Sequence, residues 1–414
     1  MRVSLGWALH ILAPLGLVVG QPVVLSAQQV EQPPTFNAAQ IAGIKRVGEN
    51  YTIRNPVKSD GILRVYVLAT PYGDFTVQGD EMVRMRINEL HALSLLEKVS
   101  NSESFGKAVA DAGLSPLKFA GSLIVNPVGT LQNTAAGVGG FFGRMGSGMN
   151  NMDNSRDNAM ADLFGVTDQR RQLAAAYGVD PYTDLPPLKA KLEQLSQAAA
   201  TGGLVVTGAM MAIPGGAGII VSNLATANKA NNLGIDEVAR SYTAAQILDL
   251  NRDILRKMGI EDGLIESLLR NRNYTPIDTV AMVAALDSLK GVQHRELFVA
   301  RAAAADGRAI AYVLRRTAEL YADDYRKHGG FVRFVSLADF PYVVTKDGRV
   351  TAILPIDALS WTRETATGFT AVTGAKKGLA PNTHGELRIT GMATAMAKQE
   401  LKVRGWTVLE RQKP

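Results

Sequence analysis

Residues 203–224 read GLVVTGAMMAIPGGAGIIVSNL, inside a longer stretch, 194–228, that contains no charged residue. A proline without an amide hydrogen and two adjacent glycines disfavour a straight helix through the middle of this segment. Each apolar half, 204–213 and 217–224, is too short on its own to cross roughly 30 Å of hydrocarbon. The pattern therefore favours a helical hairpin buried in the core, whose principal residues are Leu204, Ile213, Pro214, Gly215, Gly216, Ile219 and Ile220.

Two other interpretations of this segment stay open, a hairpin inserted in a membrane and a single kinked spanning helix. The two halves together approach the roughly 20 residues that a spanning helix requires. Glycine and alanine also let helix backbones approach closely in lipid. The same residues are therefore either core or membrane contact.

A second glycine-rich segment repeats apolar residues at alternating spacings of three and four, which is typical of a helix-packing seam. Glycines inside a helix each cost up to about 1 kcal/mol, so a large neighbour is expected close to this face. That neighbour is either the 204–224 hairpin or another helix in lipid. The predicted seam consists of Val128, Leu131, Val138, Gly139, Phe142 and Gly143, with Ala135 and Met145 completing the repeat.

The N-terminal residues have the pattern of an export signal. Arg2 supplies the positive charge, residues 3–19 are apolar, and Ala27 ends a plausible cleavage site before Gln28. An uncleaved anchor is the alternative. We expect residues 1–27 to be a signal peptide and 28–40 to be a disordered lead-in.

The composition excludes several classes of site. The 414-residue chain has no cysteine, so disulfides, thiolate nucleophiles and cysteine-bound metals are ruled out. Its 44 basic and 38 acidic residues are interleaved, so nucleic-acid binding is not predicted, although attraction to an anionic surface stays open.

The expected fold class is α+β and predominantly helical, with three regions after the lead-in. Residues 41–150 should hold a small antiparallel sheet, with strands at 51–56, 62–70 and 74–78, and helices that begin with Asp80 as N-cap. Residues 151–330 should form a helical domain around the apolar hairpin, with helices near 243–257, 263–271, 276–289, 293–304 and 307–327. Short connections predict that successive helices pack as antiparallel pairs.

The third region, residues 331–414, is predicted to be a separate small α+β domain. Strands are expected at 331–335, 342–345 and 350–354, with a hairpin turn at Asp347-Gly348. A loose loop at 365–384 is expected next, and then a strand at 386–390, a helix at 394–404 and a strand at 406–409.

Local motifs for catalysis or cofactor binding are absent from the sequence. There is no phosphate-binding loop, dinucleotide fingerprint, nucleophile elbow or zinc-protease motif, so no catalytic, cofactor-binding or metal residue is predicted. The pattern Asp153-x-Ser155-x-Asp157 does not complete a calcium loop, because Asn158 and Phe164 replace the required glycine and glutamate. His384, Trp361 and Trp406 are candidates for a partner-binding surface, although core packing is the favoured role of the two indoles.

The sequence therefore favours an exported, non-enzymatic protein of the cell envelope. It would act as a scaffold or binding module for an unidentified envelope partner, with membrane contact through its glycine-rich apolar segments. A pore-forming protein that inserts 116–146 and 204–224 is the first alternative. A hydrolase of an envelope polymer, with carboxylates drawn from separate helices, is the second.

Overall fold

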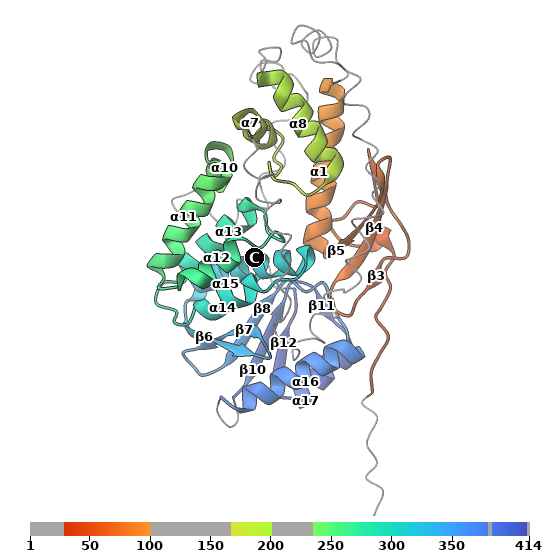
Figure 1. Ribbon diagram of the computed structural model, residues 1–414. Coiled ribbons are helices and arrows are strands. Elements are labelled where there is room, and N and C mark those ends of the chain that lie inside the picture. Colours follow the sequence, from red (N-terminus) through yellow and green to blue (C-terminus); the bar gives the residue numbers. More distant parts are fainter. Residues whose placement is uncertain (1–28, 101–166, 201–234, 380–382, 412–414) are drawn as a thin grey trace, which may run out of the picture.

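The computed structural model describes residues 29–100, 167–200, 235–379 and 383–411, which form a mixed α+β fold (Figure 1). The predicted signal peptide, the 128–145 seam and the 203–224 hairpin lie outside the described residues. Within the described ranges, no helix combines the length and hydrophobicity needed to cross a membrane.

The first described part is a small antiparallel sheet, as predicted. Its strands are β1 (Val47–Gly48), β2 (Tyr51–Ile53), β3 (Lys58–Ser59), β4 (Arg64–Thr70) and β5 (Gly73–Gln78). The order is β1-β2-β4-β3, and β5 pairs with β4. Alternating residues such as Tyr66, Leu68 and Val77 are buried, which gives the sheet one core face.

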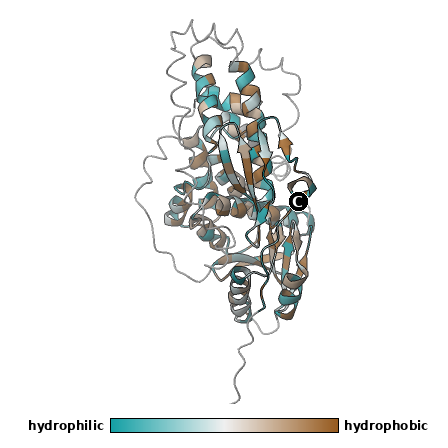
Figure 2. Ribbon diagram, turned by 90° about the vertical axis from the view of Figure 1, so that its right-hand side faces the viewer, coloured by the Kyte–Doolittle hydropathy of each residue, from teal (hydrophilic) through white to brown (hydrophobic). Residues whose placement is uncertain are grey.

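Helix α1 (Asp80–Ser100) leaves this sheet and packs with α7 (Asp168–Ala176) and α8 (Pro186–Ala200). We call these three helices the arm. Leu90 and Leu93 of α1 share a hydrophobic core with Leu192 and Leu195 of α8. The two long helices end at the same extremity of the protein, at the top of Figures 1 and 2.

The start of α1 differs in detail from the prediction that Asp80 acts as its N-cap. The Asp80 carboxylate accepts hydrogen bonds from Arg64 Nη1 (2.6 Å) and Tyr66 Oη (2.5 Å). Asp357, far along the chain, accepts instead from the backbone amides of Asp80 (3.0 Å) and Arg64 (3.1 Å). A residue of the C-terminal region therefore caps the first helix.

Six helices follow and match the predicted ones closely where predictions were made: α10 (Ile235–Ser241), α11 (Ala244–Lys257), α12 (Asp262–Leu269), α13 (Pro276–Ser288), α14 (Glu296–Ala303) and α15 (Arg308–His328). Thr243 and Thr275 form capping boxes at α11 and α13. The closest packing joins α13 with α15 and α11 with α13, so helices two apart in sequence are the main neighbours.

The C-terminal sheet has the order β12-β10-β8-β7-β6. Its strands are β6 (Phe331–Leu337), β7 (Phe340–Thr345), β8 (Val350–Leu354), β10 (Gly385–Ile389) and β12 (Trp406–Leu409). The first three are antiparallel, whereas β8, β10 and β12 are parallel. Two short strands, β9 (Ala358–Leu359) and β11 (Met392–Ala393), form a separate parallel pair.

Helices cover both faces of this sheet. Helices α14 and α15 contact β6, β7 and β8 on the face of the sheet that is turned toward α10–α13. Helices α16 (Arg363–Lys377) and α17 (Ala395–Val403) lie on the other side, below the sheet in Figure 1. Tyr321 of α15 meets Phe334 of β6 edge to face, with ring centroids 5.7 Å apart. Because one hydrophobic core includes α11–α15 and the sheet, residues 331–414 do not pack as the separate domain predicted. We call α10–α15 and this sheet, with α16 and α17, the body.

Helix α16 occupies most of the region predicted to be a loose loop, 365–384. Its threonines and glycines have weak helix propensity, which hides it from sequence patterns. Thr362 caps the helix by accepting from the Thr365 amide, and Ala366, Phe369 and Val372 bury one face. Tertiary packing therefore overrides local preference here.

Residues 29–40 also differ from the predicted disordered lead-in. The Glu31 carboxylate accepts from the Trp361 amide (2.6 Å) and from the Thr394 hydroxyl. Phe36 pairs with Val57 in an isolated antiparallel bridge. Two of these partners, Trp361 and Thr394, are more than 300 positions away, which local composition cannot reveal.

Gly391 offers a test of the packing between β9 and β11. A Cβ atom at this position would lie 2.0 Å from the carbonyl oxygen of Asp357. Gly391→Ala should therefore lower the free energy of unfolding by at least about 2 kcal/mol, measured by urea denaturation. Gly374→Ala is the matched control: nothing lies within 4 Å of its Cβ position in α16, so it should stabilise by up to about 1 kcal/mol. Equal effects of the two substitutions would contradict this packing.

Candidate functional site

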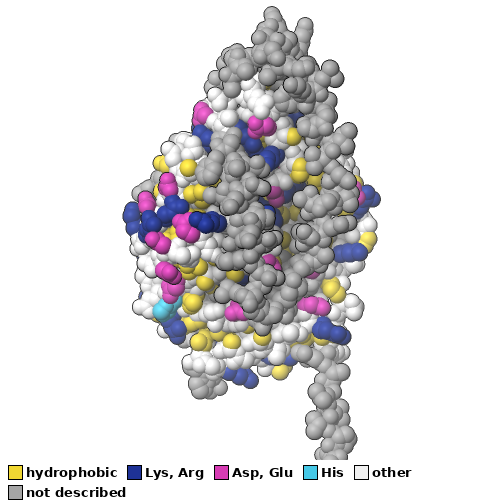
Figure 3. Space-filling view, viewed as in Figure 1, with side chains coloured by type: hydrophobic (Ala, Val, Ile, Leu, Met, Phe, Trp, Pro, Cys, Tyr) yellow, Lys and Arg dark blue, Asp and Glu magenta, His cyan; other side chains and the backbone are white. Residues whose placement is uncertain are grey.

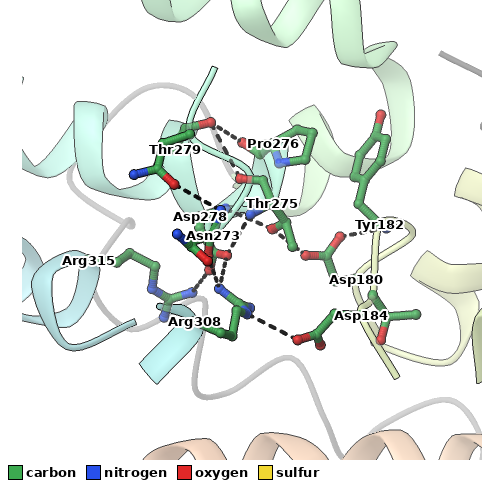
Figure 4. Close-up of polar contacts among 12 residues, drawn as sticks. Asp180, Tyr182, Asp184, Asn273, Thr275, Pro276, Asp278, Thr279, Arg308 and Arg315 are labelled. Atoms are coloured by element: carbon green, nitrogen blue, oxygen red, sulfur yellow. Dashed lines mark hydrogen bonds and ion pairs between the residues drawn. The ribbon is translucent and has the colours of Figure 1, made fainter. Parts of the chain in front are cut away.

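The arm meets the body along a band of buried charge. Two large hydrophobic cores lie on either side, one shared by the arm and the N-terminal sheet and one inside the body. Between them, side chains from α1, the 177–185 loop, α13 and α15 form ion pairs, part of which Figure 4 shows. We call this region the joint.

The ion pairs of the joint form a single chain in which acids and arginines strictly alternate. Successive nitrogen–oxygen distances are 2.9, 2.8, 3.4, 3.4, 2.5, 3.4, 2.8 and 2.7 Å. Both ends of the chain are residues of α1, so it leaves the arm, crosses the body and returns. In order, its members are Glu81, Arg316, Glu319, Arg315, Asp278, Arg308, Asp184, Arg86 and Glu89.

Most of this chain is removed from water. The side chains of Asp278, Arg315 and Glu319 are at most 5% exposed, whereas Asp184 is 41% exposed and opens the chain to solvent at one point. A buried ion loses its hydration, and it is tolerated only where a partner of opposite charge compensates. Alternation gives every arginine of this chain two acidic partners.

Local helix chemistry places the central members. Thr275 begins α13 with a capping box: its hydroxyl accepts from the Asp278 amide (3.1 Å), and Asp278 Oδ2 accepts from the Thr275 amide (2.9 Å). On α15, Arg308, Arg315 and Glu319 are spaced by seven and four residues and share one face. That face of α15 therefore meets the first turn of α13 with opposite charge.

Asp180 lies beside these alternating ion pairs but forms no ion pair with any of their members. Its Oδ1 accepts from the Tyr182 amide (2.8 Å), and its Oδ2 accepts from the Thr275 hydroxyl (2.6 Å). Burial, and then repulsion by Asp278, raise the pKa of Asp180 to about 7. A neutral carboxyl at this position thus coexists with charged neighbours near physiological pH.

The other acids of the joint respond differently to their surroundings. Burial acts to raise the pKa of Asp184, but Arg86 and Arg308 outweigh it and lower the pKa to about 2. Burial also opposes ionisation of Asp278, yet Arg308 and Arg315 hold its pKa below the usual range. The pKa of Glu89 is raised, chiefly by burial. Asp184 and Asp278 therefore stay charged at neutral pH.

This arrangement supports orientation rather than catalysis. Each carboxylate in the chain is occupied by one or two guanidinium groups and faces a protein partner instead of an open cleft. A surface pocket between α11 and α12 offers no free acid pair either, because Asp249 and Glu266 both bind Arg252, at 2.5 and 2.7 Å. In the described ranges, no cluster of three or more His, Asp or Glu side chains is arranged to hold a metal ion.

Surface charges over the body are interspersed by sign on the face shown in Figure 3. Arg252 pairs with Asp249, and Arg256 pairs with Asp262 at 2.7 Å. Neighbouring opposite charges cancel each other's field at a distance. This part of the described surface therefore lacks the basic stripe that nucleic-acid binding requires.

The two tryptophans considered for a partner-binding surface do not form one. Trp361 and Trp406 are 0% and 1% exposed, so both belong to the core. Trp361 stacks on Phe369, and Trp406 Nε1 donates to Thr373 Oγ1 (3.0 Å). Helix α16, which the sequence did not predict, provides both contacts, so core packing is the role of the two indoles.

His384 is exposed, and its Nε2 lies 2.9 Å from the Thr407 hydroxyl. Neither His384 nor the two tryptophans contribute to the joint. The other predicted site residues, Leu204, Ile213, Pro214, Gly215, Gly216, Ile219, Ile220, Val128, Leu131, Val138, Gly139, Phe142 and Gly143, lie outside the described residues.

The residues of the joint were not predicted as a site. Glu81 and Arg316 are 235 positions apart, so no local pattern connects them. The end of α15 likewise carries acids with distant partners: Asp323 is 4% exposed, and Asp324 binds Arg388 at 2.6 Å. The one available local signal was the Thr-x-x-Asp capping box at 275–278.

Comparison of the chain with known protein families, with curated proteins and with solved structures gives no match.

Asp278 is the test of the joint, because it binds both Arg308 and Arg315. Asp278→Ala leaves two buried arginines short of a partner and removes half of a capping box, so it should lower the free energy of unfolding by about 3–5 kcal/mol. Urea denaturation at neutral pH measures this loss. Asp249→Ala, which removes the 74%-exposed partner of Arg252, should cost less than about 1 kcal/mol. A loss as small for Asp278→Ala would show that the ion chain does not hold the joint.

Proposed function

We propose that this protein is an exported, non-enzymatic scaffold of the cell envelope whose arm presents two glycine-rich apolar segments to a membrane. The observation that carries the proposal is the common end of α1 and α8 (Figure 1). Residues 119–143, which follow α1 in the sequence, contain no charged residue. The charge-free stretch 194–228 begins inside α8 and continues beyond the end of that helix to Asn228.

Several features support membrane contact for these segments. Each exceeds the roughly 20 uncharged residues that a spanning helix requires, so each is long enough to enter a bilayer. The seam at 128–145 places Gly139 and Gly143 four residues apart, a spacing that allows close helix packing in lipid. Helices α1 and α8, which precede the two segments in the sequence, pack side by side.

The joint supports the scaffold part of the proposal. An arm that carries membrane-contacting segments must transmit force to the body. The joint suits this role, because a buried ion pair fixes both the direction and the distance between its two charged groups. The occupied carboxylates do not favour the hydrolase alternative, since general acid–base catalysis needs an acid that can reach a substrate.

Pore formation remains the second candidate, and the same geometry favours it. Two apolar segments that each follow one of two neighbouring helices can insert as a pair, as the 116–146 and 204–224 alternative requires. Contact and pore formation differ in whether sealed vesicles leak.

Vesicle flotation tests the proposal. The protein beginning at Gln28 is mixed with dye-loaded vesicles of phosphatidylcholine and phosphatidylglycerol and centrifuged through a density gradient; we expect it to float with the lipid. Ile219→Asp combined with Val138→Asp should reduce the bound fraction at least tenfold, because each charge placed in the bilayer centre costs about 2.5–3.5 kcal/mol.

Val403→Asp is the matched control. Val403 is 79% exposed at the end of α17, so a charge there should leave flotation unchanged. Wild-type protein that stays at the bottom of the gradient at acid and neutral pH would refute membrane contact and assign 204–224 to a protein core. Flotation with dye release indicates a pore, and flotation with sealed vesicles indicates a scaffold.

A further inference from the structure

With Asp180, the joint holds two more carboxyl groups than the ion chain has arginines. The alternating chain already contains five acids and four arginines, and both of its ends are acidic. Asp180 is a sixth acid, attached through Thr275 rather than through an arginine. A buried region with such an excess of negative charge favours the uptake of a proton.

Thr275 brings two carboxyl groups to one residue. Its hydroxyl donates to Asp180 Oδ2 and accepts from the Asp278 amide, while its own amide donates to Asp278 Oδ2. This threonine is the N-cap of α13, whereas Asp180 belongs to the loop that connects α7 and α8. At this point the arm and the body are therefore connected through Thr275, which bonds to Asp180 on one side and to Asp278 on the other.

We propose that Asp180 makes the joint proton-dependent. With a neutral carboxyl, Asp180 holds the 177–185 loop on the first turn of α13, and the arm is seated on the body. With a charged carboxylate, Asp180 and Asp278 repel each other, and the loop separates from α13. The proposal concerns the joint alone, so it goes beyond the membrane function and does not depend on it.

The charged groups around Asp180 come from several elements. Asp278 of α13 opposes its ionisation, and Arg308 of α15 favours it. Arg308 is already engaged by Asp278 at 2.5 Å and by Asp184 at 3.4 Å. Arg170 of α7 also acts on Asp180, but its guanidinium binds Glu193 at 3.2 Å. Tyr182, in the same loop, is a neutral phenol. The nearby cations are thus shared with other acids.

The direction of the pH effect follows from comparing the seated and released forms. A released, hydrated aspartic acid loses its proton near pH 4, whereas in the seated form the pKa of Asp180 is about 7. Between these values the seated form holds a proton that the released form has lost. Rising pH therefore weakens the joint across this window, and the effect levels off above pH 7. The lowered pKa values of Asp184 and Asp278 act with the opposite sign, in more acidic solution.

The proton itself can be observed by carbon-13 NMR of protein labelled at the aspartate side-chain carboxyl. We expect one resonance to titrate near pH 7, to be absent from Asp180→Asn, and to persist in Asp253→Asn, which changes an exposed acid on α11. Wild-type spectra without any aspartate carboxyl titrating between pH 6 and 8 would overturn the proposal, whatever the variant does.

Movement of the joint can be measured separately with two spin labels. The chain has no cysteine, so Gln197→Cys on α8 and Lys257→Cys on α11, both exposed, give unique attachment sites. Pulsed dipolar spectroscopy should show a narrow distance distribution at pH 5 and a second population at pH 8. The ratio of released to seated forms should rise by up to about tenfold per pH unit between pH 5 and 7.

Asp180→Asn keeps the shape of the neutral carboxyl, so it should give the narrow distribution at both pH values, whereas Asp253→Asn should behave as the wild type. An unchanged wild-type distribution from pH 5 to 8, or a pH response retained in Asp180→Asn, would overturn the mechanism. Neither readout involves a membrane, so failure of vesicle binding and failure of the joint are separate results.

Discussion

The structure depends on the requirement that a guanidinium withdrawn from water keeps a carboxylate beside it. Arg315 and Arg316 are 4% and 7% exposed, and each binds two acids. Hydrophobic contact is non-directional and would let the arm slide over the body. Ion pairs with fixed donor geometry allow far fewer orientations. The alternating chain therefore determines how two hydrophobic cores, each stable through apolar packing, are placed relative to one another.

Where structure is determined locally, the sequence predicted it well. The helix at Pro276–Ser288 was found from its threonine cap and proline, and the strands Val350–Leu354 and Trp406–Leu409 were found from their apolar runs. Helix α16 was missed because its threonines and glycines disfavour a helix until Phe369 is packed in the core. The separate domain expected after residue 330 was an error of the same kind, since α15 and β6 each look complete but share one core.

The candidate site was beyond local patterns. Its residues look like ordinary helix-surface charges, because α1 and α15 carry acids and arginines three or four positions apart, as at Arg86–Glu89 and Arg315–Glu319. Only the fold shows that those faces meet each other instead of water. The aromatic residues are the converse case: the partner surface considered for Trp361 and Trp406 does not form, because a helix that local patterns did not reveal covers both indoles. Burial of charge and of indole alike is decided by which elements become neighbours.

The partners of α1 have a consequence for the order of assembly. Its first amide is capped by Asp357, and Glu81 on its charged face binds Arg316. A ribosome makes this helix long before it makes those residues. The N-terminal third must therefore wait, without its final contacts, until most of the chain exists. Contacts that span so much sequence slow folding, and a slowly maturing chain stays accessible to chaperones for longer.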